Sequence, residues 1–371
     1  MHPQVPYFSL SEQHQALKKD LLHAIEKTID QNNFCLGPDV DAFETEFKPF
    51  SGTDFCVAMN SGTSALHIAL LLHNIGPGDE VITTPFTFAS TSWAISYVGA
   101  KPVYVDIEPN TYQIDPTKIE AAINSRTKAI LPVHLYGHPC DMDAILAIAD
   151  KHGLPVIEDA AQAHGAAYKG RIVGNLGRQS CFSFYPTKNL GACGEGGVLC
   201  TNQPDLARRA IALRNHGSYQ RYHYEEVGYN YRMEGIQAAV LRVKLRHLNS
   251  WLEARRSHAE VYHQRLATLT SLGLILPQEQ VWARSSWHLY VVRHPRRDAL
   301  QQHLQDHGVG SAIHYPIPLH LQKCYEPLGY APGSFPVAEQ VARECLALPF
   351  YPEMTPTQIH RVCEVLQAYP A

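Results

Sequence analysis

The chain has 371 residues, of which 45% are hydrophobic and 18% are charged, and its formal net charge is -4. This length can bury a large core and favours one large domain with a smaller one. The near-balanced charge gives no electrostatic reason to expect nucleic acid as a partner. No apolar run approaches the roughly 18 residues of a membrane span, and no signal-peptide pattern opens the chain. We therefore expect a cytoplasmic protein with no membrane partner.

Nine cysteines are scattered along the chain without any Cys-x-x-Cys pair. This pattern indicates reduced, mostly buried cysteines rather than a disulfide framework. A reactive thiol at Cys193, close in sequence to Lys188, is an alternative, although no adjacent His or Arg is evident to lower its pKa.

The first predicted element is an amphipathic helix over residues 11–31, opened by Ser9 or Ser11, with an apolar face of Leu17, Leu21, Leu22, Ile25 and Ile29. From about residue 55, short apolar strands alternate with helices. The expected strands are 80–83, 102–106, 129–133, 154–157, 181–184 and 197–200. The expected helices are 63–72, 90–97, 116–124, 142–151 and 204–214. This alternation predicts an α/β fold with a mostly parallel sheet covered by helices on both faces.

A charged helix over 241–262 is expected to leave this sheet. We place a large domain at 1–249 and a smaller C-terminal α/β domain at 250–371. The second contains a strand at 288–292 and a final helix at 357–366.

Two residues whose side chains could take part in catalysis follow strand ends, where parallel α/β sheets bind their ligands. Lys188 comes after the strand at 181–184 and before the glycine-rich run 191–197. Most lysines are surface charges. A lysine in a glycine-lined pocket, however, loses solvation, and its amine becomes a better nucleophile for imine formation. Lys188 is therefore our candidate catalytic residue.

The second is Asp159, which follows the strand at 154–157. One interpretation is a helix cap. The other is a partner for the ring nitrogen of pyridoxal phosphate (PLP), because a buried carboxylate stabilises the pyridinium form. Gln162 could donate to the ring 3-oxygen, and His164 either covers the site or is structural. An acid of this kind together with Lys188 is the minimum protein chemistry of a PLP enzyme.

Small polar residues at 60–64 open an apolar helix. Free N–H groups and the helix dipole there could bind phosphate, with Ser183 adding a hydroxyl; the alternative is an ordinary N-cap by Ser61 or Thr63. Phe88, after another strand end, could stack on the pyridine ring or lie in the core. A competing cluster of metal-ligand types, His134, His138, Cys140 and Asp141, lacks a second cluster to complete it, so we expect no metal.

Taken in order, several segments resemble the nucleotide-sugar aminotransferases, which are PLP enzymes of fold type I, the aspartate aminotransferase-like group. The similarity covers nearly the whole chain. It runs through 34–38, 61–66, 84–91, 102–106, 134–137, 158–162, 182–188, 228–233 and 314–320.

The resemblance implies a role for each matching residue. Lys188 would form the imine and shuttle the proton, Asp159 would pair with the ring nitrogen, Gln162 would contact the ring oxygen, and Phe88 would stack on the ring. The phosphate would be held by Gly62, Thr63, Ser64 and Ser183, and by Asn230 of a neighbouring subunit, which implies a homodimer with a shared site. Family dehydratases have histidine in place of the lysine, so Lys188 favours transamination.

The expected reaction moves an amino group from an amino acid, L-glutamate in this family, to a nucleotide-linked keto sugar, as deoxyamino sugar and glycan biosynthesis requires. The segment 310–322 is similar to enzymes that aminate carbon 3 of TDP-3-keto-6-deoxyhexoses. The implied substrate contacts are Tyr185, Arg232, His314 and Tyr315.

Several alternatives remain open. The substrate could be a UDP-3-keto sugar, such as a 3-keto uronic acid, or a 4-keto sugar. The protein could also be a regulator that binds PLP or a sugar nucleotide without turnover. A NAD-dependent sugar dehydrogenase fits the α/β pattern, but no G-x-G-x-x-G follows the first strand.

Overall fold

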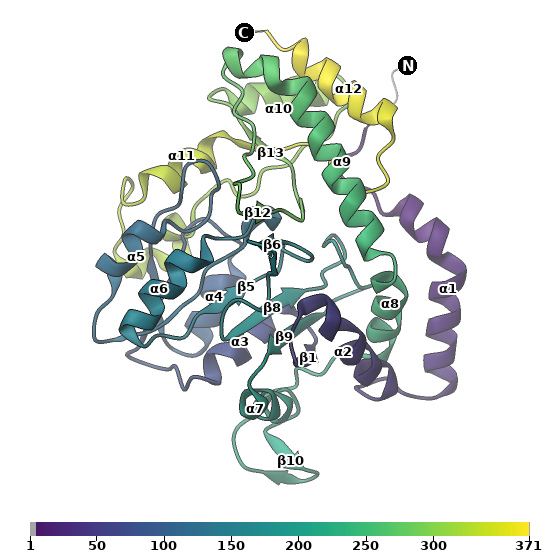
Figure 1. Cartoon of the computed structure of the whole chain (residues 1–371), viewed down its shortest axis with the longest axis vertical. Helices are drawn as coiled ribbons and strands as arrows, with labels where there is room; N and C mark the ends of the chain where they lie inside the picture. Colours follow the sequence, from purple (N-terminus) through teal and green to yellow (C-terminus); the bar gives the residue numbers. More distant parts are fainter. Residues whose placement is uncertain (1–4, 371) are drawn as a thin grey trace.

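A computed structural model describes residues 5–370. Its central sheet has the order β3–β2–β4–β5–β8–β9–β1, since backbone bridges from Ile130 to Val156 and from Val133 to Asp159 join two hydrogen-bonded groups of strands. The part of the sheet from β5 through β8 and β9 to β1 can be followed in Figure 1. The strands are β1 (Phe55–Met59), β2 (Glu80–Thr83), β3 (Lys101–Tyr104), β4 (Thr127–Ile130), β5 (Ile157–Asp159), β8 (Gln179–Ser183) and β9 (Gly197–Thr201). Six of these strands run in one direction, and β9 runs antiparallel to them. The predicted mostly parallel sheet is confirmed.

Alternate residues of each strand point to opposite faces of the sheet and enter different cores. Val57 and Val81 pack in the core that contains residues of α3 (Gly62–Leu71), α4 (Ser90–Tyr97) and α7 (Pro204–Arg214). Their neighbours Ala58 and Ile82 pack in a second core with α2 (Pro38–Ser51), α5 (Pro116–Ala122), α6 (Met142–His152) and α8 (Gly235–Leu245). Helices therefore cover both faces, as predicted.

The first helix, α1 (Ser11–Asp30), begins at one of the two predicted serines, and the N–H of Ser11 donates to Ser9 Oγ at 3.2 Å. Leu17 and Leu21 pack against α8. The predicted apolar face is wrong for Leu22 and Ile29, which are 56% and 50% exposed. The reason is that α1 packs mainly along α8, and a single neighbouring helix covers only a narrow stripe of its surface.

The single helix predicted at 241–262 is also wrong, because α8 ends at Leu245 and α9 (Leu248–Leu266) follows. The chain turns between them at Arg246 and His247. This turn lets α8 stay packed on the sheet while α9 leads to the C-terminal elements (Figure 1).

The C-terminal part has its own core, which includes Tyr262 and Tyr290. It contains the antiparallel pair β13 (Val291–Arg293) and β14 (Cys345–Ala347), with α10 (Arg297–Asp306), α11 (Pro336–Glu344) and α12 (Pro356–Gln367). The predicted strand at 288–292 is thus shorter and begins later, whereas the final helix lies where expected. The boundary at 249/250 stays a prediction; it falls in the first turn of α9.

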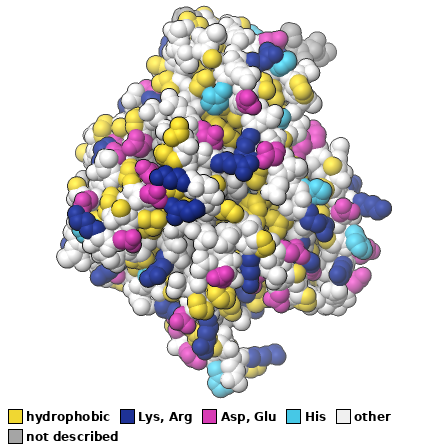
Figure 2. Space-filling model, viewed as in Figure 1, with side chains coloured by type: hydrophobic (Ala, Val, Ile, Leu, Met, Phe, Trp, Pro, Cys, Tyr) yellow, Lys and Arg dark blue, Asp and Glu magenta, His cyan; other side chains and the backbone are white. Residues whose placement is uncertain are grey.

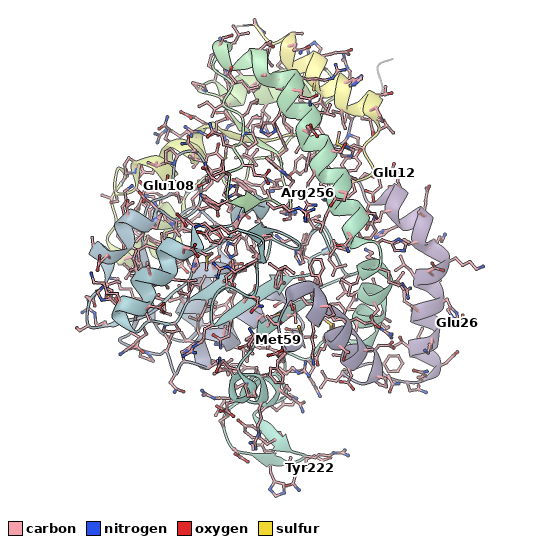
Figure 3. The ribbon with its side chains drawn as sticks, viewed as in Figure 1. Glu12, Glu26, Met59, Glu108, Tyr222 and Arg256 are labelled. Atoms are coloured by element: carbon pink, nitrogen blue, oxygen red, sulfur yellow. The ribbon has the colours of Figure 1, made fainter. Side chains whose placement is uncertain are left out.

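Two small sheets lie outside this framework. One is β12–β6–β7, from Ala283–Arg284, Ala167–Tyr168 and Arg171–Ile172. The other is the hairpin of β10 (Ser218–Gln220) and β11 (His223–Tyr224), which projects from the body with Tyr222 at its tip (Figures 1 and 3). Charged side chains of both signs are interspersed on the face in Figure 2. Within residues 5–370, no helix combines the length and apolar character needed to cross a membrane.

Candidate active site

The candidate residues gather where β5 and β8 end. Asp159 is the last residue of β5 and Ser183 the last of β8, and the two strands pair in parallel. Their carboxyl ends therefore lie at one edge of the sheet, as the alternation of elements predicts. Lys188 follows in the loop after β8, where its backbone N–H donates to the Tyr185 carbonyl at 2.8 Å.

The Asp159 carboxylate is only 4% exposed and is held at both oxygens. The Thr91 hydroxyl donates to Oδ2 at 2.7 Å, and the backbone N–H of Ala161 donates to Oδ1 at 3.1 Å. Burial raises the pKa of Asp159, while these hydrogen bonds and the charge of Lys188 oppose the rise. A cationic ring nitrogen beside this group would favour the ionised form further.

The Lys188 amine is half-buried and has lost much of its hydration. Desolvation lowers the pKa of Lys188 to about 8, against a smaller opposing effect of the Asp159 charge. An amine with such a pKa is partly neutral near physiological pH, as a lysine that attacks an aldehyde or takes a proton from carbon must be.

Gln162 is fixed by the backbone of a neighbouring loop. Its Oε1 accepts from the N–H of Tyr136 at 2.8 Å, and its Nε2 donates to the Tyr315 hydroxyl at 3.2 Å. An amide NH₂ has two donors, so one remains for a ligand oxygen. Phe88 lies 6.0 Å from the Tyr315 ring between centroids, and it is 52% exposed, so it is not the core phenylalanine that the sequence allowed.

The start of α3 faces the end of β8. Ser61 caps the helix by accepting from the N–H of Ser64 at 3.0 Å, as the sequence allowed. A Cβ on Gly62 would lie 2.8 Å from the Ser183 Cβ, so only glycine permits this approach. Within the described part of the chain, the backbone N–H groups of Gly62 and Thr63 have no acceptor. Together with the Ser183 hydroxyl they form an anion cradle.

Two of the predicted phosphate-binding hydroxyls already have partners in the protein. The Thr63 hydroxyl donates to Ser90 at 2.8 Å, and the Ser64 hydroxyl donates to Asn60 Oδ1 at 2.7 Å. Each hydroxyl has a single proton, which is already donated within the protein, so neither hydroxyl can donate to phosphate in this arrangement. The backbone of this segment is therefore the better phosphate ligand.

The predicted substrate residues fall into two groups. Tyr136 donates its hydroxyl to the His314 carbonyl, and this fixes the segment that carries His314 and Tyr315 beside Gln162. Desolvation lowers the pKa of His314 to about 4, so this ring is neutral. Tyr185 is 48% exposed next to the Lys188 loop.

Asn230 and Arg232 lie on the segment beside the end of β1, where Arg232 pairs with Met59. Arg232 Nε donates to Asn230 Oδ1 at 3.1 Å, and Asn230 is exposed. Its side chain is accessible to another molecule.

Two histidines singled out from the sequence are buried in the structure. His164 is buried against Phe182, with ring centroids 5.2 Å apart, which favours the structural interpretation. His134 uses both ring nitrogens: Nε2 donates to Glu158 at 3.0 Å, and Nδ1 accepts from the Cys140 N–H at 3.0 Å. Among residues 5–370, no three His, Cys, Asp or Glu side chains converge as a metal site would require.

Sequence reasoning missed several residues around the site. Thr91 and Tyr136 lie inside matching segments, at 84–91 and 134–137, so the pattern included them without indicating a role. Asn189 and His288 form a buried pair next to Lys188, with Asn189 Oδ1 3.2 Å from His288 Nδ1. No local signal could have linked these two distant positions.

Comparison with known proteins places this site in context. The chain is 45% identical over 365 residues to the "Pleiotropic regulatory protein" of Geobacillus stearothermophilus, covering 98% of each. It is 44% identical to the dTDP-3-amino-3,4,6-trideoxy-alpha-D-glucose transaminase of Streptomyces venezuelae, covering 99% of this chain and 96% of that protein. It is also 44% identical to the UDP-N-acetyl-3-dehydro-alpha-D-glucosamine 3-aminotransferase of Acidithiobacillus ferrooxidans, covering 98% and 97%.

The solved structure of S. venezuelae DesV in complex with a ketimine intermediate matches with a TM-score of 0.96 and 44% identity, covering 98% of each chain. This likeness confirms the predicted α/β fold of a PLP-dependent aminotransferase. The model of the DegT/DnrJ/EryC1/StrS aminotransferase family matches residues 15–367. The chain belongs to the DegT/DnrJ/EryC1/StrS aminotransferase family, whose members use PLP.

Proposed function

We propose that the protein transfers an amino group from L-glutamate to carbon 3 of a TDP-linked 3-keto-6-deoxyhexose. The observation that carries the chemistry is the half-buried Lys188, with its pKa lowered to about 8, at the same sheet edge as the Asp159 carboxylate. The sugar is supported by the similarity to a dTDP-3-amino sugar transaminase at 44% identity. By analogy with the family, we assign Lys188 as the catalytic residue.

The residues present fit PLP in three respects. The cradle of Gly62, Thr63 and Ser183 would hold the phosphate, the exposed Phe88 ring would stack on the pyridine, and Asp159 would accept from the ring N–H. Gln162 would donate its remaining N–H to the ring oxygen. When bound, PLP supplies an aldehyde that carries the amino group and a ring that accepts electrons.

The protein's own groups would then move protons and orient substrates. The neutral Nζ of Lys188 would accept the proton from the α carbon of glutamate in the first half-reaction. In the second half it would deliver a proton to complete amination of the sugar. In our assignment, the sugar or its nucleotide would be contacted by Tyr185, Arg232, His314 and Tyr315.

We propose a homodimer with a shared site. Two large aromatic side chains of α4 are exposed: Trp93 by 38% and Tyr97 by 57%. The projecting hairpin exposes Tyr222 by 72%. Apolar surface of this kind is typical of an interface. A second copy would cover it and would bring its Asn230 to the phosphate, which the exposed position of Asn230 permits.

The shared site can be tested by mixing two variants, Lys188→Ala and Asn230→Ala. Each homodimer would have two defective sites, whereas a mixed dimer would have one site that is defective twice and one that is intact. Statistical mixing would restore roughly a quarter of wild-type activity. A mixture no more active than the sum of its parts would exclude this arrangement.

The nine free cysteines also support the cytoplasm as the location of the protein.

The primary test is the visible spectrum of the protein with PLP, before and after L-glutamate. Loss of the yellow colour on glutamate would establish the first half-reaction, and its return with a keto sugar would identify the acceptor. TDP-linked 3-keto, UDP-linked 3-keto and 4-keto sugars should be compared, because a 3-amino transaminase of UDP sugars is equally similar. Colour that glutamate leaves unchanged would point to another donor or to a non-catalytic regulator. Retained turnover in Lys188→Ala would refute the assignment.

A further inference from the structure

One side chain donates a hydrogen bond to the Asp159 carboxylate within residues 5–370, and it comes from a different element. Thr91, in the first turn of α4, is 1% exposed, and its hydroxyl donates to Asp159 Oδ2 at 2.7 Å. The remaining donor to this carboxylate, the Ala161 N–H, belongs to the backbone that follows it. Thr91 is thus the side chain that couples α4 to the end of β5.

A second buried hydroxyl lies behind the first. Thr87, 3% exposed, has its Oγ1 at 3.0 Å from Thr91 Oγ1. An ionised carboxylate has no proton to give, so Thr91 must donate its single proton to Asp159. Thr87 must then donate to Thr91. The direction of both bonds is therefore fixed, and each polarises the other toward the carboxylate.

We propose that Thr91, supported by Thr87, is a positioning residue that keeps the Asp159 carboxylate ionised and turned toward the cofactor ring nitrogen. The inference rests on the proposed function, because the group served by Asp159 is the PLP ring. Thr91 does not touch the cofactor in this scheme. It acts through Asp159, whose negative charge holds the proton on the ring nitrogen.

The need for such a device follows from the burial of Asp159. Burial alone raises the pKa of Asp159, and the Thr91 hydrogen bond is first among the groups that lower it, followed by the Ala161 N–H. The ionisable groups that influence Asp159 or are influenced by it come from four segments: Lys188, His134, Cys181 and Tyr315. Lys188 stabilises the ionised form of Asp159 only while its amine is protonated, and the pKa of this amine is about 8. The Thr91 hydroxyl therefore supports ionisation when the lysine is neutral.

The test compares Thr91→Val, which replaces the hydroxyl by a methyl group, with Thr91→Ser, which keeps it. Ser96→Ala is a matched control, because its hydroxyl lies on the same helix and donates to the Ser92 carbonyl at 3.2 Å. PLP affinity is measured by quenching of protein fluorescence, and stability by thermal melting. We expect Thr91→Val to weaken PLP binding at least tenfold, with Thr91→Ser and Ser96→Ala within about threefold of wild type.

Two further readouts separate positioning from a merely structural role. The acid limb of the kcat profile should move to higher pH in Thr91→Val, because Asp159 then protonates more readily. A PLP analogue with carbon in place of the ring nitrogen should bind Thr91→Val and wild type equally well. In an Asp159→Asn background, Thr91→Val should have little further effect on PLP binding, since coupled residues are not additive.

Equal weakening for PLP and the carbon analogue, or a Thr91→Ser variant as impaired as Thr91→Val, would overturn the inference. So would unchanged PLP affinity and an unchanged acid limb in Thr91→Val. If the wild-type protein took up no PLP, the proposed function itself would be refuted. That outcome is distinguishable from failure of the inference about Thr91, in which the wild type binds PLP normally.

Discussion

The lowered pKa of Lys188 gives a quantitative prediction for the protein without cofactor. An ordinary lysine has a pKa of about 10.4, so about one amine in a thousand is neutral at pH 7.5. With the Lys188 pKa lowered to about 8, about a quarter of the amines are neutral at that pH. The neutral fraction of Lys188 at pH 7.5 is therefore roughly two hundred times that of an ordinary lysine, and Lys188 should react with an electrophile faster than an exposed lysine of equal accessibility.

The perturbation that tests the cause is Asp159→Asn. The negative charge of Asp159 raises the pKa of Lys188 against the effect of desolvation. Its removal should therefore move the midpoint of Lys188 further down, and the neutral fraction at pH 7.5 should increase. The substitution preserves the size of the side chain, so the desolvation of Lys188 should change little.

The assay is brief labelling of the cofactor-free protein with acetic anhydride across pH 6 to 11, with peptide mass spectrometry to follow each lysine. Exposed lysines in the same digest provide the reference curve. Labelling of Lys188 should reach half its maximum near pH 8 in the wild type and at lower pH in Asp159→Asn. The reasoning would be refuted if Lys188 of the wild type reached half-maximal labelling at the same pH as the exposed lysines. It would also be refuted if this pH were higher in Asp159→Asn than in the wild type.

Three other predictions concern the cradle, a buried acid and the stacking ring. Gly62→Ala should weaken PLP binding, because its Cβ would lie 2.8 Å from that of Ser183, whereas Gly76→Ala, with its nearest atom at 3.8 Å, should bind PLP normally in the same titration. Glu158→Gln should cost about 3 kcal/mol or more of unfolding free energy at pH 7, since the buried carboxylate accepts from three backbone N–H groups and from a histidine. These contacts depress the pKa of Glu158. The loss of unfolding free energy in Glu158→Gln, measured by urea unfolding, should therefore be complete at pH 7 and smaller as the pH falls below about 4. As a control, substitution of the exposed Glu120 by Gln should leave the urea midpoint unchanged. Phe88→Leu should leave the melting temperature unchanged, since the ring is 52% exposed, but should weaken PLP binding by about 0.5–1.5 kcal/mol through lost stacking.

Much of the fold could be predicted because hydrophobic patterning and strand ends are local. Helices α4 and α7 lie at the predicted residues, 90–97 and 204–214. The position of Asp159 and Ser183 at one edge followed from the parallel order of their strands. The predicted strands at 154–157 and 288–292 are displaced, since β5 covers Ile157–Asp159 and β13 covers Val291–Arg293. The break between α8 and α9 and the exposed residues of α1 also differed, since both depend on which distant surface each helix meets.

The hydrogen bonds of the site could not be predicted, because they join segments far apart in the chain. Thr91 meets Asp159 across 68 positions, and Gln162 meets Tyr315 across 153. A hydroxyl or an amide has no sequence signal that tells which partner it will find. The sequence therefore identified the residue types of the site but not which of them are coupled.

This coupling changes how the candidate substrate residues should be interpreted. Tyr315 was assigned to the sugar from the resemblance alone, yet its hydroxyl accepts from Gln162 Nε2 at 3.2 Å. In our proposal the other N–H of that amide serves the cofactor ring. A substrate that displaces or polarises Tyr315 would therefore change the hydrogen bond to the ring oxygen through a single amide group. Substrate recognition and cofactor tuning would then share Gln162, and a substitution at Tyr315 would alter the spectrum of bound PLP as well as the affinity for sugar.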